Sequence, residues 1–276
     1  MGTLYVVGTP IGNLEDITLR ALRVLREVDL IAAEDTRKTL KLLSHYDIHV
    51  PIESYHRHSG PAKLERLLAV LQTRNVALVS EAGMPGISDP GQELIATALA
   101  RGIPVVPVPG PSALVTALVV SGLPTERFLY LGFLPRVRPD RRRLLQSVAA
   151  QPFTLVMFEA PHRLPAALAD LLDTLGDRPA AAARELTKIH EEVLRGSISA
   201  LRAHFQSEPP RGEITLVVGP PEKPPSPALE VGESQLLEMA RRLRSEGLSS
   251  KQAVQRLMEA TGAGRRDAYR AWLASG

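Results

Sequence analysis

The stretch Val76–Gly91, VALVSEAGMPGISDPG, determines the architecture expected for this chain. Its first four residues, Val76–Val79, are apolar, and they stop abruptly at a loop rich in glycine and proline. A buried parallel strand that delivers a ligand loop at its carboxyl end has this pattern. The glycines let the backbone approach a ligand closely, while the prolines stiffen the loop. An ordinary surface turn with polar side chains is the alternative, but similar loops at other strand ends favour ligand binding.

Other strand-like segments of the chain also end in polar or glycine-containing loops. Leu4–Gly8 and Val105–Val108 are each followed by such a loop and then by a helical pattern. The helix that begins around Pro109–Ala113 leaves amide groups that can hold an anion. Leu30–Ala33 ends in the charged segment Glu34–Lys38, which is costly to bury without partners. Strands alternating with helices in this way predict an α/β fold.

A change of pattern near Ser121–Thr125 indicates a short linker to a second α/β domain. A strand at Phe153–Phe158 there ends in a further polar segment, Glu159–Arg163. Five prolines in Pro220–Pro227 predict a stiff, extended linker before two or three small helices. The expected domains are an N-terminal α/β domain (residues 1–122), a second α/β domain (123–219), a proline-rich linker (220–228) and a small helical domain (229–276).

Composition limits the classes of function. The 276 residues exceed one typical domain, and a 44% hydrophobic content is enough for a sizeable core. The sequence contains no cysteine, which excludes disulfides and thiolate chemistry. We expect no metal, because no ligand set has a recognisable spacing. No apolar run approaches the length of a membrane span, so we expect a cytoplasmic protein with no membrane partner.

The net charge of +3 is too small to predict nucleic-acid binding by itself. Its distribution is more informative, because Arg136–Arg143 contains five arginines, whose flat guanidinium groups suit phosphates and stack on bases. A solvated helix face is an equally good explanation of this run. In the C-terminal segment, Lys251, Arg265, Arg266 and Arg270 can track phosphates. A helix-turn-helix-like RNA-binding module and a dimerising or docking domain are both compatible with this segment.

Eight segments, in this order, resemble the ribosomal RNA small-subunit methyltransferase I family of the tetrapyrrole methylase superfamily. They are GTPIGNLEDIT, AAEDTR, SEAGMPGISDPG, VPGPSA, GFLPR, FEAPHRL, ARELTKIHEE and GEITLVV, within residues 3–219. The resemblance implies an S-adenosylmethionine-dependent enzyme that methylates the ribose 2′-hydroxyl of a cytidine. That cytidine would lie in the decoding region of 16S rRNA, within the small ribosomal subunit. Two α/β domains of this type with an active-site cleft between them, and a homodimer, are also implied.

The resemblance also implies a set of residues that contact the cofactor. These are Pro10, Ile11, Glu81, Ala82, Gly83, Ser112, Ala113, Phe158 and Leu186. The family's usual loop is DAGTPLISDPG, and this chain departs from it at three positions. Glu81 stands for Asp and reaches one methylene further, Met84 stands for Thr and removes a hydroxyl, and Gly86 stands for Leu.

Methyl transfer from a sulfonium is an in-line displacement, to which correct positioning of the hydroxyl contributes strongly. A ribose hydroxyl is a poor nucleophile, so a base that accepts its proton would help. Glu34 and Asp89 are possible acceptors, but the predicted catalytic residues are Asp35, Glu159, Glu185 and Lys188, with Asp35 and Glu159 slightly favoured. Arginine stays protonated, so Arg37, Arg141, Arg142 and Arg163 are the predicted RNA contacts.

Two alternative functions remain open from the sequence. One is a methylase of a tetrapyrrole or another small molecule, against which only the family-specific segments and the helical tail argue. The other is a non-enzymatic RNA-binding protein that uses its tail as the reader. Hydrolysis of a nucleotide is disfavoured, because no GxxxxGK[ST] segment occurs.

Overall fold

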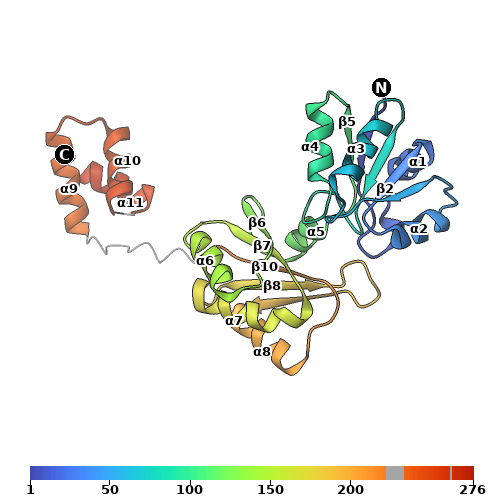
Figure 1. Ribbon diagram of the computed structural model, residues 1–276. Coiled ribbons are helices and arrows are strands. Elements are labelled where there is room, and N and C mark those ends of the chain that lie inside the picture. The colour runs from blue at the N-terminus through green and yellow to red at the C-terminus, as the bar shows by residue number, and fades with distance from the viewer. Residues whose placement is uncertain (222–232, 262) are drawn as a thin grey trace. The chain divides into compact units, whose positions relative to one another are not determined.

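The computed structural model describes residues 1–221, 233–261 and 263–276 (Figure 1). The chain divides into two compact units, Met1–Pro220 and Pro221–Gly276. Most of the linker predicted over 220–228 lies outside the described residues. The elements of the larger unit are β1 (Leu4–Val7), η1 (Leu14–Asp16), α1 (Leu19–Glu27), β2 (Leu30–Ala33), α2 (Thr36–His45), β3 (Ile52–Ser54), α3 (Pro61–Val70), β4 (Val76–Val79), α4 (Gln92–Ala100), β5 (Val105–Val108), α5 (Ala113–Val120), β6 (Phe128–Phe133), α6 (Arg138–Val148), β7 (Thr154–Glu159), η2 (Pro161–Arg163), α7 (Leu164–Leu175), β8 (Pro179–Arg184), β9 (Glu192–Ser197), α8 (Ile198–Ser207) and β10 (Ile214–Val218).

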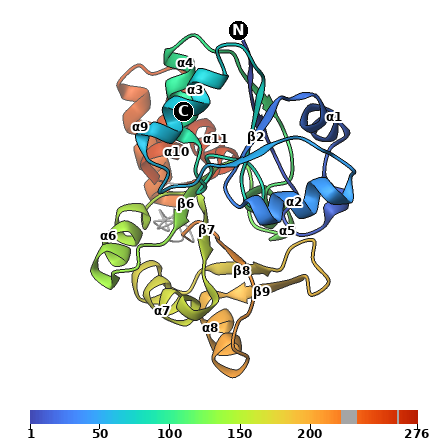
Figure 2. The same ribbon diagram turned by 45° about the vertical axis from the view of Figure 1, so that its right-hand side comes forward.

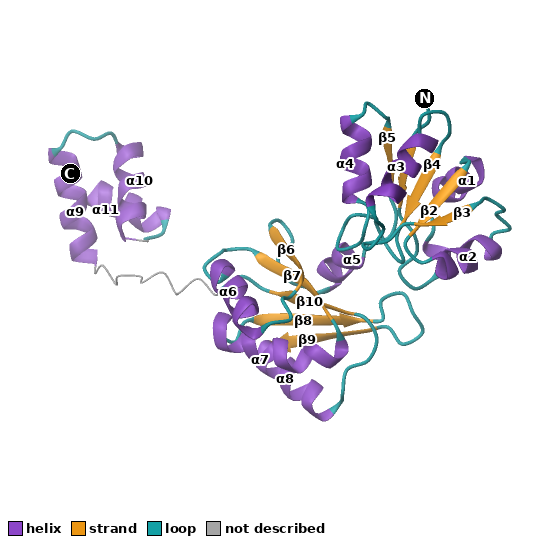
Figure 3. Ribbon diagram, viewed as in Figure 1, coloured by secondary structure: helices purple, strands orange, loops and turns teal. Residues whose placement is uncertain are grey.

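The first sheet contains five short parallel strands in the order β3-β2-β4-β1-β5. Helices cover both of its faces (Figure 3). Along β4, Ala77 and Val79 face the core that contains α1 and α2, whereas Val76 and Leu78 face the core that contains α3 and α4. All four side chains are buried, so a continuous apolar run is what a strand in this position requires.

The second sheet is mixed, with the order β6-β7-β10-β8-β9. Only β6 and β7 pair in parallel, and the remaining pairs are antiparallel. α6, α7 and α8 contribute to the core on one face, which includes Met157 of β7 (Figure 2). The adjacent residue, Val156, points to the opposite face and packs in a core with Ala117 and Leu118 of α5.

Helix α5 therefore connects the two sheets. It follows β5 of the first sheet in the chain, yet its buried residues Ala117 and Leu118 pack on the second sheet, near Val217 of β10. The segment between β5 and α5 brings the carboxyl ends of the first sheet to this face of the second sheet. The expected α/β fold class is confirmed: the unit contains two sheets with helices, and α5 joins them through a common core.

The C-terminal unit is helical, as predicted. Its helices are α9 (Glu233–Ser245), α10 (Ser250–Thr261) and α11 (Arg265–Ala274). They share a small core that includes Leu243, Leu257 and Trp272. Ser249 N donates to Gln252 Oε1 over 3.2 Å at the start of α10, which is one half of a capping box. Across the described part of the chain, no helix is long and apolar enough to span a bilayer.

Candidate active site

The loops that follow β1, β4 and β5 touch one another through their backbones. Thr9 N donates to Gly83 O over 2.9 Å, and Gly83 N donates to Thr9 O over 3.0 Å. Gly8 lies so close to Gly110 that a Cβ atom on Gly8 would stand 2.7 Å from Gly110 Cα. No side chain fits at that contact, so glycine permits the close approach of the β1 and β5 loops.

The segment after β8 of the second sheet meets the β1 loop. Asn13 N donates to Thr187 Oγ1 over 3.0 Å. A Cβ on Gly12 would lie 2.9 Å from Leu186 O and 2.5 Å from Lys188 Cγ, so this glycine is also packed against its neighbours. Thr187 has a positive φ of 65°, which marks local strain in the segment that contacts the loop.

Four of the predicted cofactor residues lie in one apolar cluster. Ile11 and Leu186 are buried in it, while Ala82 and Ala113 are partly buried beside them. These residues come from four different segments, so folding alone gathers them. The sequence segments that resemble cofactor-binding motifs therefore converge at one place in the described structure.

The other predicted cofactor residues lie around this cluster or beside it. Gly83 forms the backbone bridge to Thr9 described above, Pro10 directly follows Thr9 in the chain, and Ser112 is the N-cap of α5. Phe158 lies against Tyr130, with ring centroids 5.3 Å apart. Glu81 is exposed and ion-paired with Lys38, so its carboxylate faces outward from the loop.

These residues fit S-adenosylmethionine chemically. Ile11, Ala113 and Leu186 offer an apolar surface for the flat adenine ring. Ser112 makes no side-chain capping bond, so the first amides of α5 can receive a carboxylate. An apolar floor beside free backbone donors suits a ligand that combines an aromatic base with a charged amino-acid end.

Two partly buried carboxylates lie near each other: Glu34 directly follows β2, and Asp89 belongs to the loop between β4 and α4. Burial raises the pKa of Asp89 to about 6, and the negative charge of Glu34 adds to this shift. Burial also raises the pKa of Glu34, against the opposing charges of Arg57 and Lys38. Asp89 is therefore a carboxylate that exchanges its proton close to neutral pH.

The residue before Asp89 ties the β4 loop to the second sheet. Ser88 Oγ and the Tyr130 hydroxyl lie 2.6 Å apart. Ser88 also has a positive φ of 62°, and its carbonyl accepts a hydrogen bond of 3.4 Å from Arg57 Nη2. Strained residues that are held by several contacts often mark a functional site, and here they fix the position of Asp89.

The profile of the tetrapyrrole (corrin/porphyrin) methylases matches residues 3–202, most of the larger unit. The chain belongs to the tetrapyrrole methylase family. This match, together with the relatives that follow, confirms the resemblance derived from the eight sequence segments.

Relatives of this methylase match it over most or nearly all of the chain. A protein of Synechocystis sp. named ribosomal RNA small subunit methyltransferase I is 49% identical over 273 residues, 98% of this chain and 96% of that relative. A protein of the same name from Thermotoga maritima is 50% identical over 219 residues, which cover 79% of this chain and 98% of that relative.

Solved structures of methylases have the same fold as the larger unit. Uroporphyrin-III-C-methyltransferase of Thermus thermophilus covers 79% of this chain and 94% of its own, with a TM-score of 0.55 and 26% identity. A diphthine synthase structure gives a TM-score of 0.61 at 15% identity, covering 79% of this chain and 90% of its own, so the two share the fold alone.

Two of the residues predicted to be catalytic, Asp35 and Glu159, make contacts that stabilise the fold. Asp35 is the N-cap of α2, and its Oδ1 accepts hydrogen bonds from Arg37 N (2.8 Å) and Lys38 N (3.3 Å). Glu159 is buried, 1% exposed, and its Oε1 lies 3.1 Å from Arg163 Nε. Glu159 is therefore paired with arginine inside the protein, and its role as a proton acceptor stays a prediction.

Glu185 and Lys188 are paired with each other. Lys188 Nζ lies 3.1 Å from Glu185 Oε1, which also accepts a hydrogen bond from Glu213 N over 3.0 Å. Burial opposes ionisation of Glu185, but these hydrogen bonds outweigh it and hold the pKa of its carboxyl below the usual range. The pair lies in the segment that packs against Gly12. Because the two groups are paired, neither is suited to accept a proton near neutral pH.

The predicted RNA-contacting arginines differ in accessibility. Arg141 is buried, with Nε 2.8 Å and Nη2 2.5 Å from Asp170 Oδ2, so its guanidinium group is occupied inside the protein. Arg163 is mostly buried on Glu159, and Arg142 lies 3.4 Å from Asp173 with a partly exposed side chain. Arg37 is the most accessible of the four, with 88% of its side chain exposed.

Tyr130 is a site residue that the sequence did not single out. It lies within a strand, where an aromatic residue ordinarily packs in a core, and its partners Ser88 and Phe158 come from distant segments. No local pattern predicts such a contact. The presence of tyrosine between apolar strand residues was the one available signal.

Proposed function

We propose that the chain transfers a methyl group from S-adenosylmethionine to the 2′-hydroxyl of a cytidine ribose in the decoding region of 16S rRNA. Its substrate would be the small ribosomal subunit. The proposal rests mainly on the relative of 49% identity, which is named for methylation of small-subunit rRNA and aligns with 98% of this chain. The convergence of Ile11, Ala82, Ala113 and Leu186 supports it from the side of the geometry.

When bound, S-adenosylmethionine supplies an electrophilic methyl carbon on a sulfonium. The contribution of the chain is to fix the position of the two reactants. The glycine loops form a backbone cradle, because Gly8 and Gly110 approach each other too closely for side chains and Gly83 is bonded to Thr9 through its backbone. The cluster around Ile11 and Leu186 excludes water from that cradle. Such positioning removes much of the entropic cost of bringing two reactants together.

Asp89 is the residue that we assign as acceptor of the ribose proton. Asp35, Glu159 and Glu185 are each held by amides or cations, as described above. Burial raises the pKa of Glu159 too, but that side chain is 1% exposed, whereas Asp89 is only partly buried. The pKa of Asp89 is raised to about 6, and a base with a pKa close to the working pH is the most effective one. Its loop also carries Ala82 and Gly83, so an acceptor there lies on the same segment as the cofactor cradle.

Exposed cations near this loop are proposed to meet the RNA backbone. Arg37 follows the end of β2, and Arg57 donates to the carbonyl of Ser88 and is itself exposed. Arg142 is only partly exposed and is paired with Asp173, so we assign the phosphate contacts to Arg37 and Arg57. The planar guanidinium group of arginine suits phosphate oxygens.

We also propose that the chain is a homodimer in the cytoplasm. Val115 and Val119, one turn apart on α5, remain 49% and 66% exposed although the helix is almost entirely apolar. Exposed apolar residues grouped on one helix are typical of protein interfaces. Sedimentation of the full chain and of Val119→Glu tests this, since a dimer that uses this face should shift towards monomer in the variant.

The direct test uses labelled S-adenosylmethionine and small ribosomal subunits that lack the modification, followed by alkaline digestion. A 2′-O-methyl group blocks cleavage of the neighbouring phosphodiester, so we expect the label in an alkali-resistant dinucleotide that contains cytidine. Label in mononucleotides would mean that a base is methylated. Cofactor binding without incorporation would point to another substrate, such as a macrocycle, and absence of cofactor binding would favour a non-enzymatic RNA-binding protein.

A further inference from the structure

The outer side of α11 carries four exposed residues at positions i, i+3, i+4 and i+7. They are Arg266, Tyr269, Arg270 and Leu273, and we call this set the α11 face. Tyr269 is 49% exposed and Leu273 is 60% exposed. Residues with this spacing lie next to one another on a helix. The α11 face therefore presents one aromatic ring and two guanidinium groups on the same side of the helix.

The opposite side of α11 is fixed in the core of the C-terminal unit. Ala268, Ala271 and Trp272 are buried there. The guanidinium carbon of Arg244 lies 4.5 Å from the ring centroid of Trp272, and Arg244 Nη2 donates to Trp272 O over 3.0 Å. Cation–π and hydrogen-bond contacts of this kind hold the helix in one orientation, so the α11 face stays turned outward.

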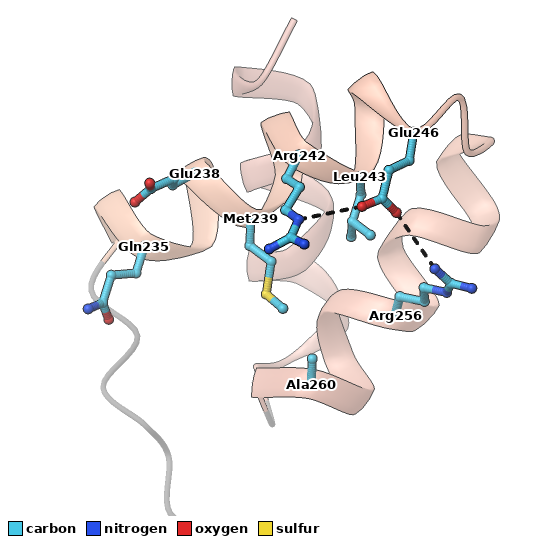
Figure 4. Close-up of a pocket in the computed structure, with 8 residues that line it drawn as sticks. All are labelled: Gln235, Glu238, Met239, Arg242, Leu243, Glu246, Arg256 and Ala260. Carbon is cyan, nitrogen blue, oxygen red and sulfur yellow. Dashed lines mark ion pairs between the residues drawn. The ribbon is translucent and has the colours of Figure 1, made fainter.

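The groove between α9 and α10 is different in charge (Figure 4). Its two arginines, Arg242 and Arg256, share Glu246, with atom separations of 3.5 Å and 3.8 Å. Glu238 adds a second carboxylate to the lining. The positive charge of the groove is thus balanced, whereas α11 has three arginines and one aspartate.

We propose that the α11 face binds RNA, with Arg266 and Arg270 on phosphates and Tyr269 stacked on a base. This inference rests on the function proposed above, in which an RNA is the substrate. Aromatic rings that stack on bases beside cations that follow the backbone are the usual components of single-stranded nucleic-acid sites. Asp267 lies 3.6 Å from Arg270, but an exposed pair of this kind is weak and phosphate can displace it.

The α11 face is expected to add affinity and to take no part in methyl transfer. The alignment with the Thermotoga maritima relative covers 98% of that protein but 79% of this chain. That relative therefore has no room for a counterpart of the C-terminal unit. A unit that a relative of the same name lacks is better suited to holding the substrate than to the chemical step.

The experiment compares full-length variants on small ribosomal subunits that lack the modification and on a protein-free 16S rRNA fragment. Arg266→Gln with Arg270→Gln removes two charges from the α11 face, and Arg242→Gln with Arg256→Gln removes two from the α9–α10 groove as the matched control. Tyr269→Ala removes the ring, and Tyr269→Phe keeps it. Emission of Trp272 verifies that each variant is folded, and cofactor affinity is measured in parallel.

For Arg266→Gln with Arg270→Gln, we expect KM for subunits to rise at least tenfold while kcat and cofactor affinity stay within twofold. The slope of log K against log salt for the fragment should fall by about 1.4 to 1.8, since each phosphate contact contributes roughly 0.7 to 0.9. Tyr269→Ala should weaken binding at least about fivefold, as loss of one stacked base does. Tyr269→Phe and the control pair should resemble the wild type.

Equal losses in the control pair, or binding by the α11 variants that matches wild type, would overturn the inference. So would weaker binding to subunits with unchanged binding to the protein-free fragment, because the partner would then be a ribosomal protein. If wild-type protein methylates subunits while the α11 variants behave normally, only this inference fails. If wild-type protein methylates no RNA, the proposed function itself fails, and the inference fails with it.

Discussion

Asp89 is the residue on which the proposed proton transfer depends. Its pKa is raised to about 6, first by burial and then by the charge of Glu34, so the basic form accumulates as the pH rises through 6. We expect kcat/KM of the wild type to rise with pH below 6 and to level off above it. Asp89→Asn removes the proton acceptor and should lower kcat by about 10²- to 10⁴-fold. The rise of kcat/KM around pH 6 should then disappear from the pH profile. The pH profile of label transfer measures both effects.

The matched control for Asp89→Asn is Glu81→Gln on the same loop. Glu81 is exposed and paired with Lys38, so its amide variant should retain the step near pH 6 and most of the activity. A profile that stays the same in Asp89→Asn would assign the proton to another group. Loss of the step in Glu81→Gln alone would assign it to that carboxylate.

Gly12 tests whether the close packing of the β1 loop supports cofactor binding. A Cβ there would lie 2.9 Å from Leu186 O, a backbone atom that cannot rotate away. Overpacking costs about 1–3 kcal/mol, so Gly12→Ala should weaken binding of S-adenosylmethionine by roughly 5- to 150-fold in Kd. Gly60→Ala is the control, because nothing lies within 4 Å of its added Cβ. Calorimetric titration that gives equal affinity for both variants would contradict the role of this contact.

At the scale of elements, Arg141 holds α6 against α7. Its guanidinium group is buried on Asp170, and hydrogen bonds from Arg138 and Arg141 keep the pKa of Asp170 below its usual value although burial opposes this. Arg141→Ala leaves a buried charge without its main partner and should lower the free energy of unfolding by about 3–5 kcal/mol. Arg143→Ala, at an exposed pair with Asp140, should change it by less than about 1 kcal/mol. Urea unfolding measures both, and equal stability of the two variants would contradict the assignment.

The sequence predicted the buried strands well, because their continuous apolar runs match burial on both faces. Val76–Val79 is the clearest case, with all four side chains buried. It did not predict β9, an edge strand whose residues are half-buried or exposed and follow no clear alternation. The segment after Glu34 was interpreted as a polar loop, although Asp35 starts α2 as its N-cap. A capping aspartate and a catalytic one look alike until the backbone amides around them are known.

Site residues could be predicted only where one continuous segment contains a recognisable sequence motif. Ile11, Ala82, Ala113 and Leu186 were expected from motifs and lie in one cluster. By contrast, nothing in the sequence separates the buried Arg141 from its exposed neighbour Arg143, because the difference depends on how α6 turns towards Asp170. The raised pKa of Asp89 likewise depends on burial and on Glu34, which lies at the end of another strand.

At the scale of the whole molecule, the chain consists of two units, each with a core of its own. The core of the C-terminal unit comes from α9, α10 and α11 alone, and the predicted cofactor residues all belong to Met1–Pro220. The proposed roles divide in the same way. The larger unit would carry out methyl transfer, and the C-terminal unit would strengthen binding to the RNA.

This division predicts that S-adenosylhomocysteine, the product left after methyl transfer, stabilises the larger unit and leaves the stability of the C-terminal unit unchanged. Trp272 is the only tryptophan of the chain and is buried in the C-terminal core, so its fluorescence reports on that unit alone. At 100 times its Kd, S-adenosylhomocysteine should add about 2.7 kcal/mol to the stability of the unit that binds it. Calorimetry should therefore show a higher Tm for the larger unit, while the midpoint followed by Trp272 emission stays within about 1 °C. Gly12→Ala serves as the control, because weaker binding should reduce the calorimetric shift. A parallel rise of the Trp272 midpoint would mean that the two units unfold together, and the proposed division of roles would then lose its physical basis.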